Sequence, residues 1–435
     1  MSVKFNQLSN AIRFLSIDAV QKANSGHPGM PMGMADVATV LFRYHLRFNP
    51  ENPNWINRDR FVLSAGHGSM LLYSLLYLSG YKSISIEDIK NFRQLNSICA
   101  GHPEYKEGSG IETTTGPLGQ GLGNAVGMAI AEEIFRKKFG SSIINNKTYV
   151  IASDGDLMEG VSHEAMSLAG HLKLKNLVVF FDNNKISIDG STSLSVSDNY
   201  KKRFESYNWE FLEVSGHNEK QISKAIFKAS KSKKPTIISC KTVIGFGSPN
   251  KSGKASSHGS PLGEEEIALV RKKLKWNNKP FEIPLEILDE WKKIGSKGAL
   301  LEKKWQEIIN KKRPQFKNEF INTNNAELGN LESLIEKQKK NYFETKPNLA
   351  TRQCSMITIE NISAILPQLI GGSADLSGSN NTKTKNSKII NSKNFNGNYI
   401  HYGVREHGMA AVMNGLALYG GIIPYGGTFL IFSDY

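Results

Sequence analysis

The stretch YVIASDG, residues Tyr149–Gly155, decides the fold. Its first four residues form a short apolar run that predicts a buried strand, and the Asp-Gly pair behind them marks the strand's carboxyl end. A helical stretch from Glu159 to Leu172 leads to a second apolar strand, Leu177–Phe181, and a third follows at Thr236–Cys240. Because strands alternate with helices, the sequence predicts an α/β fold with a parallel sheet.

The same alternation begins again further along the chain. Residues Asn361–Leu369 are mostly apolar, and Tyr399–Gly403 is a further strand candidate. Between about residues 281 and 346 the sequence is rich in Lys and Asn and offers no strand candidate, which predicts surface helices and a linker. We therefore expect two α/β domains, residues 1–320 with a helical linker from about 281, and residues 345–435.

The sequence closes on an aromatic and apolar segment, Phe429–Tyr435, without a polar tail. A parallel sheet that stopped there would have an unpaired edge and uncovered apolar faces. We therefore expect the second domain to be incomplete and the chain to be truncated at its C-terminus.

Composition narrows the classes of protein. The 435 residues include 54 Lys and Arg against 40 Asp and Glu, a net charge of +14. The lysines are interspersed with acids along helical stretches, which is typical of a solvated surface, so we expect no nucleic-acid partner. No apolar run approaches the ~20 residues of a membrane-spanning helix, and we expect neither a signal peptide nor a membrane partner. The three cysteines Cys99, Cys240 and Cys354 lie far apart, which fits a reducing compartment and predicts a cytoplasmic protein.

Polar residues follow the first two predicted strands. Asp154 comes directly after the first strand and Asn184 just after the second. In a parallel sheet both lie at the carboxyl edge, where open α/β sheets bind ligands. A carboxylate, an amide oxygen and the backbone carbonyl of Ile186 are oxygen ligands of the kind that Mg²⁺ takes, often together with phosphates. An Asp-Gly pair at a strand end is, taken alone, more often an ordinary turn.

A glycine-rich run, Thr113–Gly121, precedes a helical stretch from about Asn124 to Lys137. Glycine lets the backbone approach a cofactor closely, and a helix N-terminus favours anionic groups. Together and in this order, the glycine run and the polar strand ends indicate a cofactor site more strongly than either does alone.

These residues carry a resemblance. Asp154-Gly155 followed by Asn183-Asn184 resembles the thiamine diphosphate motif, with Ser153 in place of the usual first glycine, and the chain resembles the transketolase family. The segments that match this family's pattern are Ser25–Gly29, Gly66–Ser69, Gly101–Pro103, Glu112–Gly121, Lys241–Asn250, Ser257–Gly259 and Val404–Glu406. We expect Ser153 to leave the metal ligand in place, and the polar loop Ser377–Asn396 departs from the pattern.

The resemblance implies an architecture and a reaction. The architecture is a parallel-sheet thiamine diphosphate-binding fold with one complete diphosphate-binding domain, part of a pyrimidine-binding domain and no C-terminal domain. The reaction is transfer of a two-carbon ketol unit from a ketose phosphate, such as xylulose 5-phosphate, to an aldose phosphate, such as ribose 5-phosphate, in the pentose phosphate pathway. The cofactors would be thiamine diphosphate and Mg²⁺, or Ca²⁺ or Mn²⁺ in its place. A homodimer with shared active sites is implied, because the family's cofactor lies between two subunits.

The resemblance also assigns binding roles. Asp154, Asn184 and the carbonyl of Ile186 would hold the cation. The residues that would contact the cofactor are His67, Gly116, Pro117, Leu118, Gly155, Glu159, Asn184, His258, Phe429, Phe432 and Tyr435. Glu159 remains open to a plain role as a helix-start acid, and the three aromatic residues, without the resemblance, would be interpreted as ordinary core.

Catalytic roles follow from the same resemblance. Glu406 would hydrogen-bond the pyrimidine ring and act in acid–base catalysis through it. His27, His102 and His258 would contact the reacting carbons and hydroxyls and assist proton transfer, since imidazole can donate and accept near neutral pH. The residues that would bind the substrate are His27, His258, Arg352 and Ser379.

Alternative functions stay open at this point. The chain could be an inactive or vestigial transketolase fragment, or another thiamine-dependent ketol synthase, such as a deoxyxylulose-phosphate or dihydroxyacetone synthase. The motifs around His27, His102 and His258 favour a transketolase over a deoxyxylulose-phosphate synthase. A basic nucleic-acid binder is an alternative from a different class, and salt-dependent binding to duplex DNA would support it.

Overall fold

The computed structural model describes residues 3–325 and 327–434. They form two compact units that interleave along the chain. Unit 1 comprises the residues up to Leu122, Asn146–His163 and Lys175–Gln306. Unit 2 comprises Gly123–Asn145, Glu164–Leu174 and the residues from Glu307 onward. Each unit has its own parallel sheet, so the predicted α/β class is confirmed.

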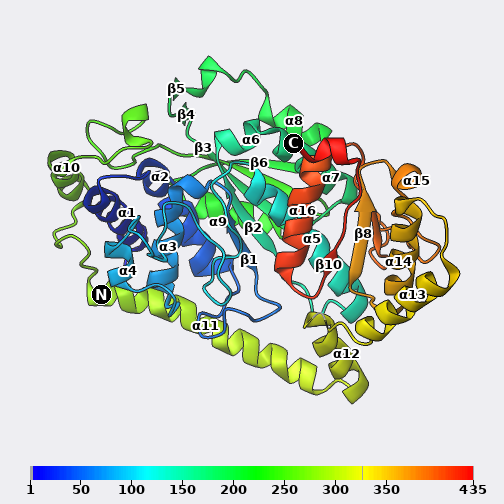
Figure 1. Ribbon diagram of the computed structural model, residues 1–435. Helices are drawn as coiled ribbons and strands as arrows, with labels where there is room; N and C mark the ends of the chain where they lie inside the picture. The colour runs from blue at the N-terminus through cyan, green and yellow to red at the C-terminus, as the bar shows by residue number, and fades with distance from the viewer. Residues whose placement is uncertain (1–2, 326, 435) are drawn as a thin grey trace. The chain divides into compact units, whose positions relative to one another are not determined.

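Unit 1 is built on a five-stranded parallel sheet with the strand order β1-β2-β3-β7-β6 (Figure 1). Its strands are β1 (Arg60–Leu63), β2 (Thr148–Ala152), β3 (Leu177–Asn183), β6 (Glu210–Ser215) and β7 (Thr236–Lys241), and a small hairpin consists of β4 (Ile186–Ser187) and β5 (Gly190–Ser191). In the centre of the sheet Val150 pairs with Val62 on one side and with Val179 on the other. All three are buried, as in parallel sheets covered on both faces.

Helices surround this sheet. Those of unit 1 are α1 (Phe5–Ala23), α2 (Gly29–Val40), α3 (Ser69–Ser79), α4 (Ile86–Lys90), α6 (Asp154–Met158), α8 (Tyr200–Ser206), α9 (Glu219–Ala229), α10 (Glu264–Leu274) and α11 (Leu285–Asn310), which ends beyond the unit. Asn24, with a φ of 48°, terminates α1 in the left-handed conformation. On α11 the fully buried Trp291 donates through Nε1 to the carbonyl of Leu8 at 3.2 Å, which attaches α11 to the core around α1.

Unit 2 has a three-stranded parallel sheet with the order β10-β8-β9. Its strands are β8 (Leu369–Ser373), β9 (Tyr399–His401) and β10 (Ile423–Pro424). Its helices are α12 (Pro314–Asn324), α13 (Leu331–Thr345), α14 (Thr351–Ile365), α15 (Ser377–Asn380) and α16 (Glu406–Tyr419), together with most of α5 (Gln120–Phe139) and α7 (Gly160–Leu172). A short 3₁₀ turn, Leu430–Asp434, lies near its end.

The backbones of α5 and α16 approach each other closely inside unit 2. A Cβ added to Gly127 would collide with the carbonyl of Val412, and one added to Gly415 would collide with the carbonyl of Asn124. Glycine at these two positions is therefore a packing requirement. Side chains of α7 also meet the start of α16, since Glu164 Oε2 accepts from the Gly408 N–H at 2.6 Å. These contacts fix where α16 begins.

The structure adds elements that the sequence did not suggest. Strands β1 and β6 were not predicted; β6 is an edge strand whose residues are only half-buried, so it lacks a continuous apolar run. The Asp-Gly turn expected after β2 is the start of the short helix α6. The polar loop expected from Ser377 to Asn396 contains the short helix α15. No strand lies between 281 and 325 or between 327 and 346, as predicted.

Candidate active site

A cavity of about 300 Å³ lies in unit 1 where β2 and β3 end. The sequence-predicted site residues that line it together are His27, His67, Gly116, Leu118, Asp154, Gly155, Asn184, Ile186 and His258. They come from loops and strand ends that are distant in sequence, and the parallel sheet brings them to one edge. Met30, Asp182, Ile188 and Ile244 also line the cavity, and sequence reasoning missed them.

Asp154 is the first residue of α6 and lines the cavity. Ser153, the residue in place of the expected glycine, caps this helix: its Oγ accepts from the Asp156 N–H at 3.3 Å. In return the Ser153 N–H donates to Asp156 Oδ2 at 2.9 Å. Ser153 therefore gives the helix start a reciprocal cap and leaves Asp154 available to a ligand.

The environment of Asp154 disfavours a lone negative charge. The residue is 4% exposed, and burial raises the pKa of its carboxyl to about 6, although the hydroxyl of Tyr200, at 3.2 Å from Oδ1, lowers it. A cation bound here would lower this pKa and stabilise the ionised form. The buried carboxylate is thus suited to a metal ligand.

Asn184 is held in a fixed orientation beside Asp154. Its Nδ2 donates to Asp182 Oδ2 at 2.9 Å, and its Oδ1 accepts from the Ile186 N–H at 2.9 Å. Burial raises the pKa of Asp182 to about 7, and the nearby charge of Asp154 contributes to that rise. The amide oxygen of Asn184 and the Ile186 backbone line the same cavity as Asp154, which is an all-oxygen donor set of the type that Mg²⁺ prefers.

A third buried carboxylate, Asp156, ties the glycine-rich loop to the end of β2. Its Oδ1 accepts from the Ser64 hydroxyl at 2.6 Å and from the Gly119 N–H at 2.9 Å. Beside it, a Cβ added to Gly155 would lie 2.7 Å from the Leu118 side chain. The loop and the strand end therefore form a narrow cradle, in which a side chain at position 155 would have to displace Leu118.

Three histidines converge on the other side of the cavity. The ring centroids of His27 and His67 lie 5.2 Å apart, those of His67 and His258 5.3 Å, and those of His27 and His258 5.8 Å. Burial, with the neighbouring imidazoles, lowers the pKa of His27 to about 4 and that of His67 to about 3, and burial also lowers that of His258. All three are therefore neutral near pH 7 and can each donate and accept a proton.

Two ring nitrogens of this cluster are unpaired. Among the described residues, Nδ1 of His27 and Nδ1 of His258 are buried and have no hydrogen-bond partner. Buried polar atoms are normally paired, because an unpaired one costs about 1–3 kcal/mol. Both unpaired atoms belong to histidines that line the cavity.

Other predicted residues of unit 1 lie outside the lining of this cavity. His102 is near it, since a Cβ added to Gly116 would lie 3.0 Å from the His102 ring. Pro117 and Glu159 are exposed. Sequence reasoning missed Arg93, which has a φ of 62° and donates to Ser25 Oγ at 2.8 Å. Burial lowers the pKa values of His27 and His102, and the positive charge of Arg93 lowers both further.

In unit 2, Glu406 is the first residue of α16. It is 8% exposed, and its Oε1 accepts from the Thr428 hydroxyl at 3.1 Å. The rings of Phe429 and Phe432 stack with centroids 6.2 Å apart, and Phe429 is 42% exposed. Tyr435 lies outside the described residues.

The two residues predicted to hold a sugar phosphate also belong to unit 2. Arg352 lies on α14 and Ser379 in α15, and both side chains are exposed. In the described parts of the chain, no group of three or more His, Cys, Asp and Glu could hold a metal ion. The donor set of Asp154, Asn184 and Ile186 is of a different kind, since two of its three oxygens are neutral.

Comparison with known families identifies the chain. Residues 5–329 match the family described as "Transketolase, thiamine diphosphate binding domain". The chain belongs to the transketolase family. Residues 347–435 match a second transketolase family, described as "Transketolase, pyrimidine binding domain". The predicted family and the thiamine diphosphate-binding fold are thus confirmed.

Curated transketolases resemble the chain along nearly all of its length. A transketolase of Buchnera aphidicola is 54% identical over 445 aligned positions, covering 99% of this chain and 65% of the relative. One from Sinorhizobium medicae is 51% identical, covering 98% of this chain and 61% of the relative. The chain therefore spans a little under two thirds of the length of these transketolases.

Solved transketolase structures share the fold. The enzyme from Leishmania mexicana superposes with a TM-score of 0.94 at 40% identity, covering 100% of this chain and 66% of that one. A Pichia stipitis transketolase in complex with sedoheptulose 7-phosphate has a TM-score of 0.92 at 41% identity, covering 99% and 65%. No helix in the described parts of our chain has the length and apolar character to cross a membrane.

Proposed function

We propose that this chain provides the thiamine diphosphate site of a transketolase, which moves a two-carbon ketol unit from a ketose phosphate to an aldose phosphate in the pentose phosphate pathway. One observation carries the proposal: a single cavity joins the oxygen donors Asp154, Asn184 and Ile186 to the neutral histidines His27, His67 and His258. The first set suits a cation on a diphosphate, and the second suits a polyhydroxylated substrate.

The cavity fits the cofactor and a divalent cation. Asp154, Asn184 and the carbonyl of Ile186 would hold Mg²⁺, or Ca²⁺ or Mn²⁺ in its place, on the diphosphate. Gly116 and Gly155 would line the cofactor, since their backbones form the open cradle. When bound, thiamine diphosphate supplies an electron sink for the transferred two-carbon unit.

The histidines would bind and orient the substrate. His27 and His258 each present a buried, unpaired Nδ1, which can accept from a sugar hydroxyl or donate to its oxygen. Because their pKa values are lowered, both stay neutral near pH 7 and can take up a proton when a hydroxyl releases one. His102, at the rim, would contact the first carbons of the donor sugar.

The remaining roles that the family implies fall on residues of unit 2. Glu406, fixed at the start of α16 by Thr428, would hold a proton at the pyrimidine ring, against which the aromatic residues Phe429, Phe432 and Tyr435 would pack. Arg352 and Ser379 would grip the sugar phosphate, since a guanidinium forks onto phosphate oxygens. The complex of a relative with sedoheptulose 7-phosphate supports sugar phosphates as the substrate class.

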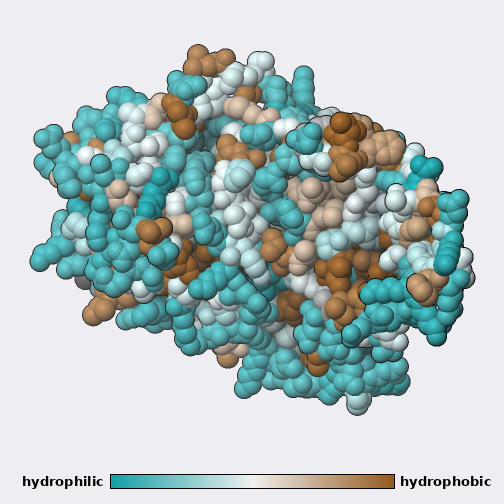
Figure 2. Space-filling view, viewed as in Figure 1, coloured by the Kyte–Doolittle hydropathy of each residue, from teal (hydrophilic) through white to brown (hydrophobic). Residues whose placement is uncertain are grey.

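We also propose a homodimer in which two subunits share each site. Unit 2 exposes large apolar side chains in its 3₁₀ turn: Leu430 is 88% exposed and Ile431 72%. Figure 2 shows hydrophobic surface gathered at this turn. Apolar groups this exposed are typical of a subunit interface. The three free cysteines support a reducing, cytoplasmic location.

The direct test is a calorimetric titration of thiamine diphosphate with Mg²⁺ into the purified chain, followed by turnover with xylulose 5-phosphate and ribose 5-phosphate. We expect saturable binding that EDTA abolishes, and pentose-dependent turnover. An absence of binding would reject the site. Binding with pyruvate-dependent turnover instead would keep the site and reject the transketolase reaction.

A further inference from the structure

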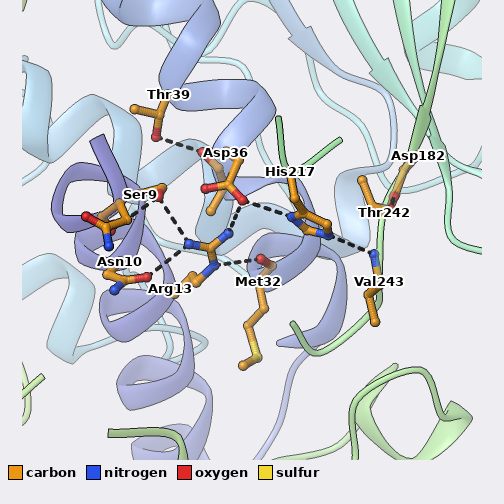
Figure 3. A network of polar contacts seen from close by, with 12 residues as sticks. Ser9, Asn10, Arg13, Met32, Asp36, Thr39, Asp182, His217, Thr242 and Val243 are labelled. Atoms are coloured by element: carbon orange, nitrogen blue, oxygen red, sulfur yellow. Dashed lines mark hydrogen bonds and ion pairs between the residues drawn. The ribbon is translucent and has the colours of Figure 1, made fainter. Parts of the chain in front are cut away.

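A buried polar network lies beside the candidate active site in unit 1 (Figure 3). At its centre Arg13 of α1, 1% exposed, donates through Nε to the Met32 carbonyl at 2.9 Å and through Nη1 to Ser9 and Asn10. Its Nη2 donates to Asp36 Oδ2 on α2 at 2.6 Å. A buried guanidinium is costly unless it is paired in this way, so the network fixes α1 against α2.

Asp36 connects Arg13 to a histidine. Its Oδ2 also lies 2.9 Å from Nδ1 of His217, which comes from the turn between β6 and α9. Burial raises the pKa of Asp36, but the charge of Arg13 and the hydrogen bonds outweigh it and lower the pKa to about 2. Asp36 is therefore ionised near pH 7 and acts only as an acceptor.

The contacts of His217 determine its tautomer. Because the Asp36 carboxylate can only accept, Nδ1 carries the proton. The Val243 backbone N–H donates to Nε2 at 3.1 Å, so Nε2 must be unprotonated. The ring stacks on Phe246 with centroids 4.1 Å apart, and the Arg13 guanidinium lies 4.6 Å from the centroid of the same Phe246 ring. His217 is thus a neutral bridge with one defined orientation.

The His217 side chain contacts a segment that forms part of the cavity wall. The segment Thr242–Gly245 follows β7, and its Ile244 side chain lines the cavity with His27 and His258. It also touches the start of α2: the Gly245 N–H donates to the Gly29 carbonyl at 3.0 Å, and a Cβ on Gly33 would lie 3.0 Å from the Val243 carbonyl. Gly29 is only two residues beyond His27, so the contact between Thr242–Gly245 and the start of α2 sets the position of that histidine.

The same segment reaches the candidate cation ligands. The Thr242 hydroxyl donates to Asp182 Oδ1, and Asp182 Oδ2 accepts from the Asn184 amide. A displacement of Thr242 and Val243 would therefore act on Asn184 and on the histidine cluster together. The contacts of Arg13 with Ser9, Asn10 and Met32 stay within α1 and α2, whereas His217 links Asp36 to Val243 in the wall of the cavity.

From these contacts we infer that His217, oriented by Asp36 and Arg13, is a positioning residue of the active site. It holds Thr242–Gly245 against the start of α2 and so fixes the spacing between His27, Ile244 and His258. The inference concerns the cavity itself, and its consequence for catalysis rests on the proposed function. No role in binding cofactor or substrate directly is assigned to His217.

Two substitutions of His217 separate its bond to Asp36 from its bond to the Val243 N–H. In His217→Gln the amide oxygen can still accept from the Val243 N–H, whereas in His217→Asn the shorter amide can only replace the donor to Asp36. We expect His217→Asn to raise amide hydrogen exchange in residues 242–246 at least tenfold and His217→Gln to raise it less. The control is His171→Asn, because His171 is exposed on α7. Faster exchange across all of unit 1, instead of in 242–246 alone, would show a merely structural role and overturn the inference.

In the binding and kinetic measurements, too, we expect a larger effect for His217→Asn than for His217→Gln. Outer partners of a ligand site typically contribute 10–100-fold, so we expect His217→Asn to weaken thiamine diphosphate binding or lower kcat/KM in that range. We expect His217→Gln to recover most of the loss. Equal losses in both variants, or none in either, would overturn the inference. If wild-type protein binds no thiamine diphosphate, the proposed function fails while the exchange measurement still tests the bridge.

A measurement on unaltered protein removes dependence on variants that fail to fold. We expect the ¹⁵N spectrum of the imidazoles, assigned by the loss of one signal in His217→Asn or His217→Gln, to show a neutral ring protonated at Nδ1. If neither variant folds, a correlation across the hydrogen bond, from the Val243 amide nitrogen to Nε2 of His217, identifies the same ring. A ring protonated at Nε2 could not accept from Val243 and would refute the bridge.

Discussion

The carboxyl edge of the unit 1 sheet and the predicted site residues of unit 2 differ in how far the chain itself prepares them. In unit 1 Asp154 and Asn184 are held by Tyr200, Asp182 and the Ile186 backbone inside one cavity. In unit 2 Arg352, Ser379 and Phe429 are exposed, and Glu406 is the one predicted residue among those described there that is buried. The proposed cation ligands are thus preorganised, whereas the residues proposed for the sugar phosphate are exposed.

Glu406→Gln tests the buried residue of unit 2 and should have the largest effect. Gln can keep the bond from Thr428 but cannot hold a proton for acid–base catalysis, an effect typically of about 10²–10⁴ in rate. We expect kcat to fall by roughly that factor, while calorimetric binding of thiamine diphosphate changes little. His407→Gln, one residue along the same helix, is the control. Full turnover in Glu406→Gln would remove the catalytic role from unit 2.

Asp154→Ala tests the preorganised edge of unit 1. Loss of the one charged group among the proposed cation ligands should weaken Mg²⁺-dependent binding of thiamine diphosphate by about 100-fold or more, judged from the 10–100-fold that outer partners contribute. Calorimetric titration measures this change, and circular dichroism checks the fold. Asp289→Ala removes an exposed carboxylate on α11 and should bind normally. Unchanged affinity in Asp154→Ala would place the cation elsewhere.

The pH dependence of the free energy of unfolding, measured without cation or cofactor, tests the burial of Asp154 in unit 1. The pKa of Asp154 is raised from 3.8 to about 6, so the folded state binds its proton more tightly than the unfolded state does. This stabilisation is complete below pH ~4 and is lost as the pH rises through ~6, at about 1.4 kcal/mol per pKa unit. Asp154→Asn should therefore raise the melting temperature without cation at pH 8 by several degrees, and by much less at pH 5. A shift that is equal at both pH values would contradict the raised pKa.

Leu430→Ser together with Ile431→Ser tests what covers the exposed turn of unit 2. Both side chains lose apolar area that a subunit interface would bury, at roughly 25 cal/mol per Å². We expect self-association, measured by sedimentation equilibrium, to weaken by about tenfold or more. Leu285→Ser, at a residue that is 75% exposed on α11, serves as control. A wild-type chain that stays monomeric at high concentration would reject the homodimer.

Much of the site was predictable because its residues follow apolar runs. Strands β2, β3 and β7 are continuous buried segments, so the sequence pattern alone places Asp154 and Asn184 at one sheet edge. Edge strand β6 was not predicted, because only Val214 of its six residues is buried and Glu210 and Glu213 interrupt its apolar residues. Periodicity reports burial, and a strand that is only partly buried gives a weak signal.

The buried acids and the histidine bridge were not predictable in the same way. Asp156, Asp182 and Asp36 resemble ordinary polar residues in the sequence, and nothing in the residues around His217 sets it apart. Their roles depend on partners far away along the chain, such as Ser64 for Asp156. A polar side chain acquires a defined orientation only when packing removes water and leaves one set of partners.

The sequence by itself determined the family, the parallel α/β class and the identity of the residues at the strand ends, because local apolar patterns and motif order survive without tertiary information. Only the tertiary structure decided that Asp154 is buried with a raised pKa, that His27, His67 and His258 form one cluster, and that His217 binds the wall beside them. Desolvation and hydrogen-bond pairing are properties of neighbours in space, and the folded chain alone brings those neighbours together.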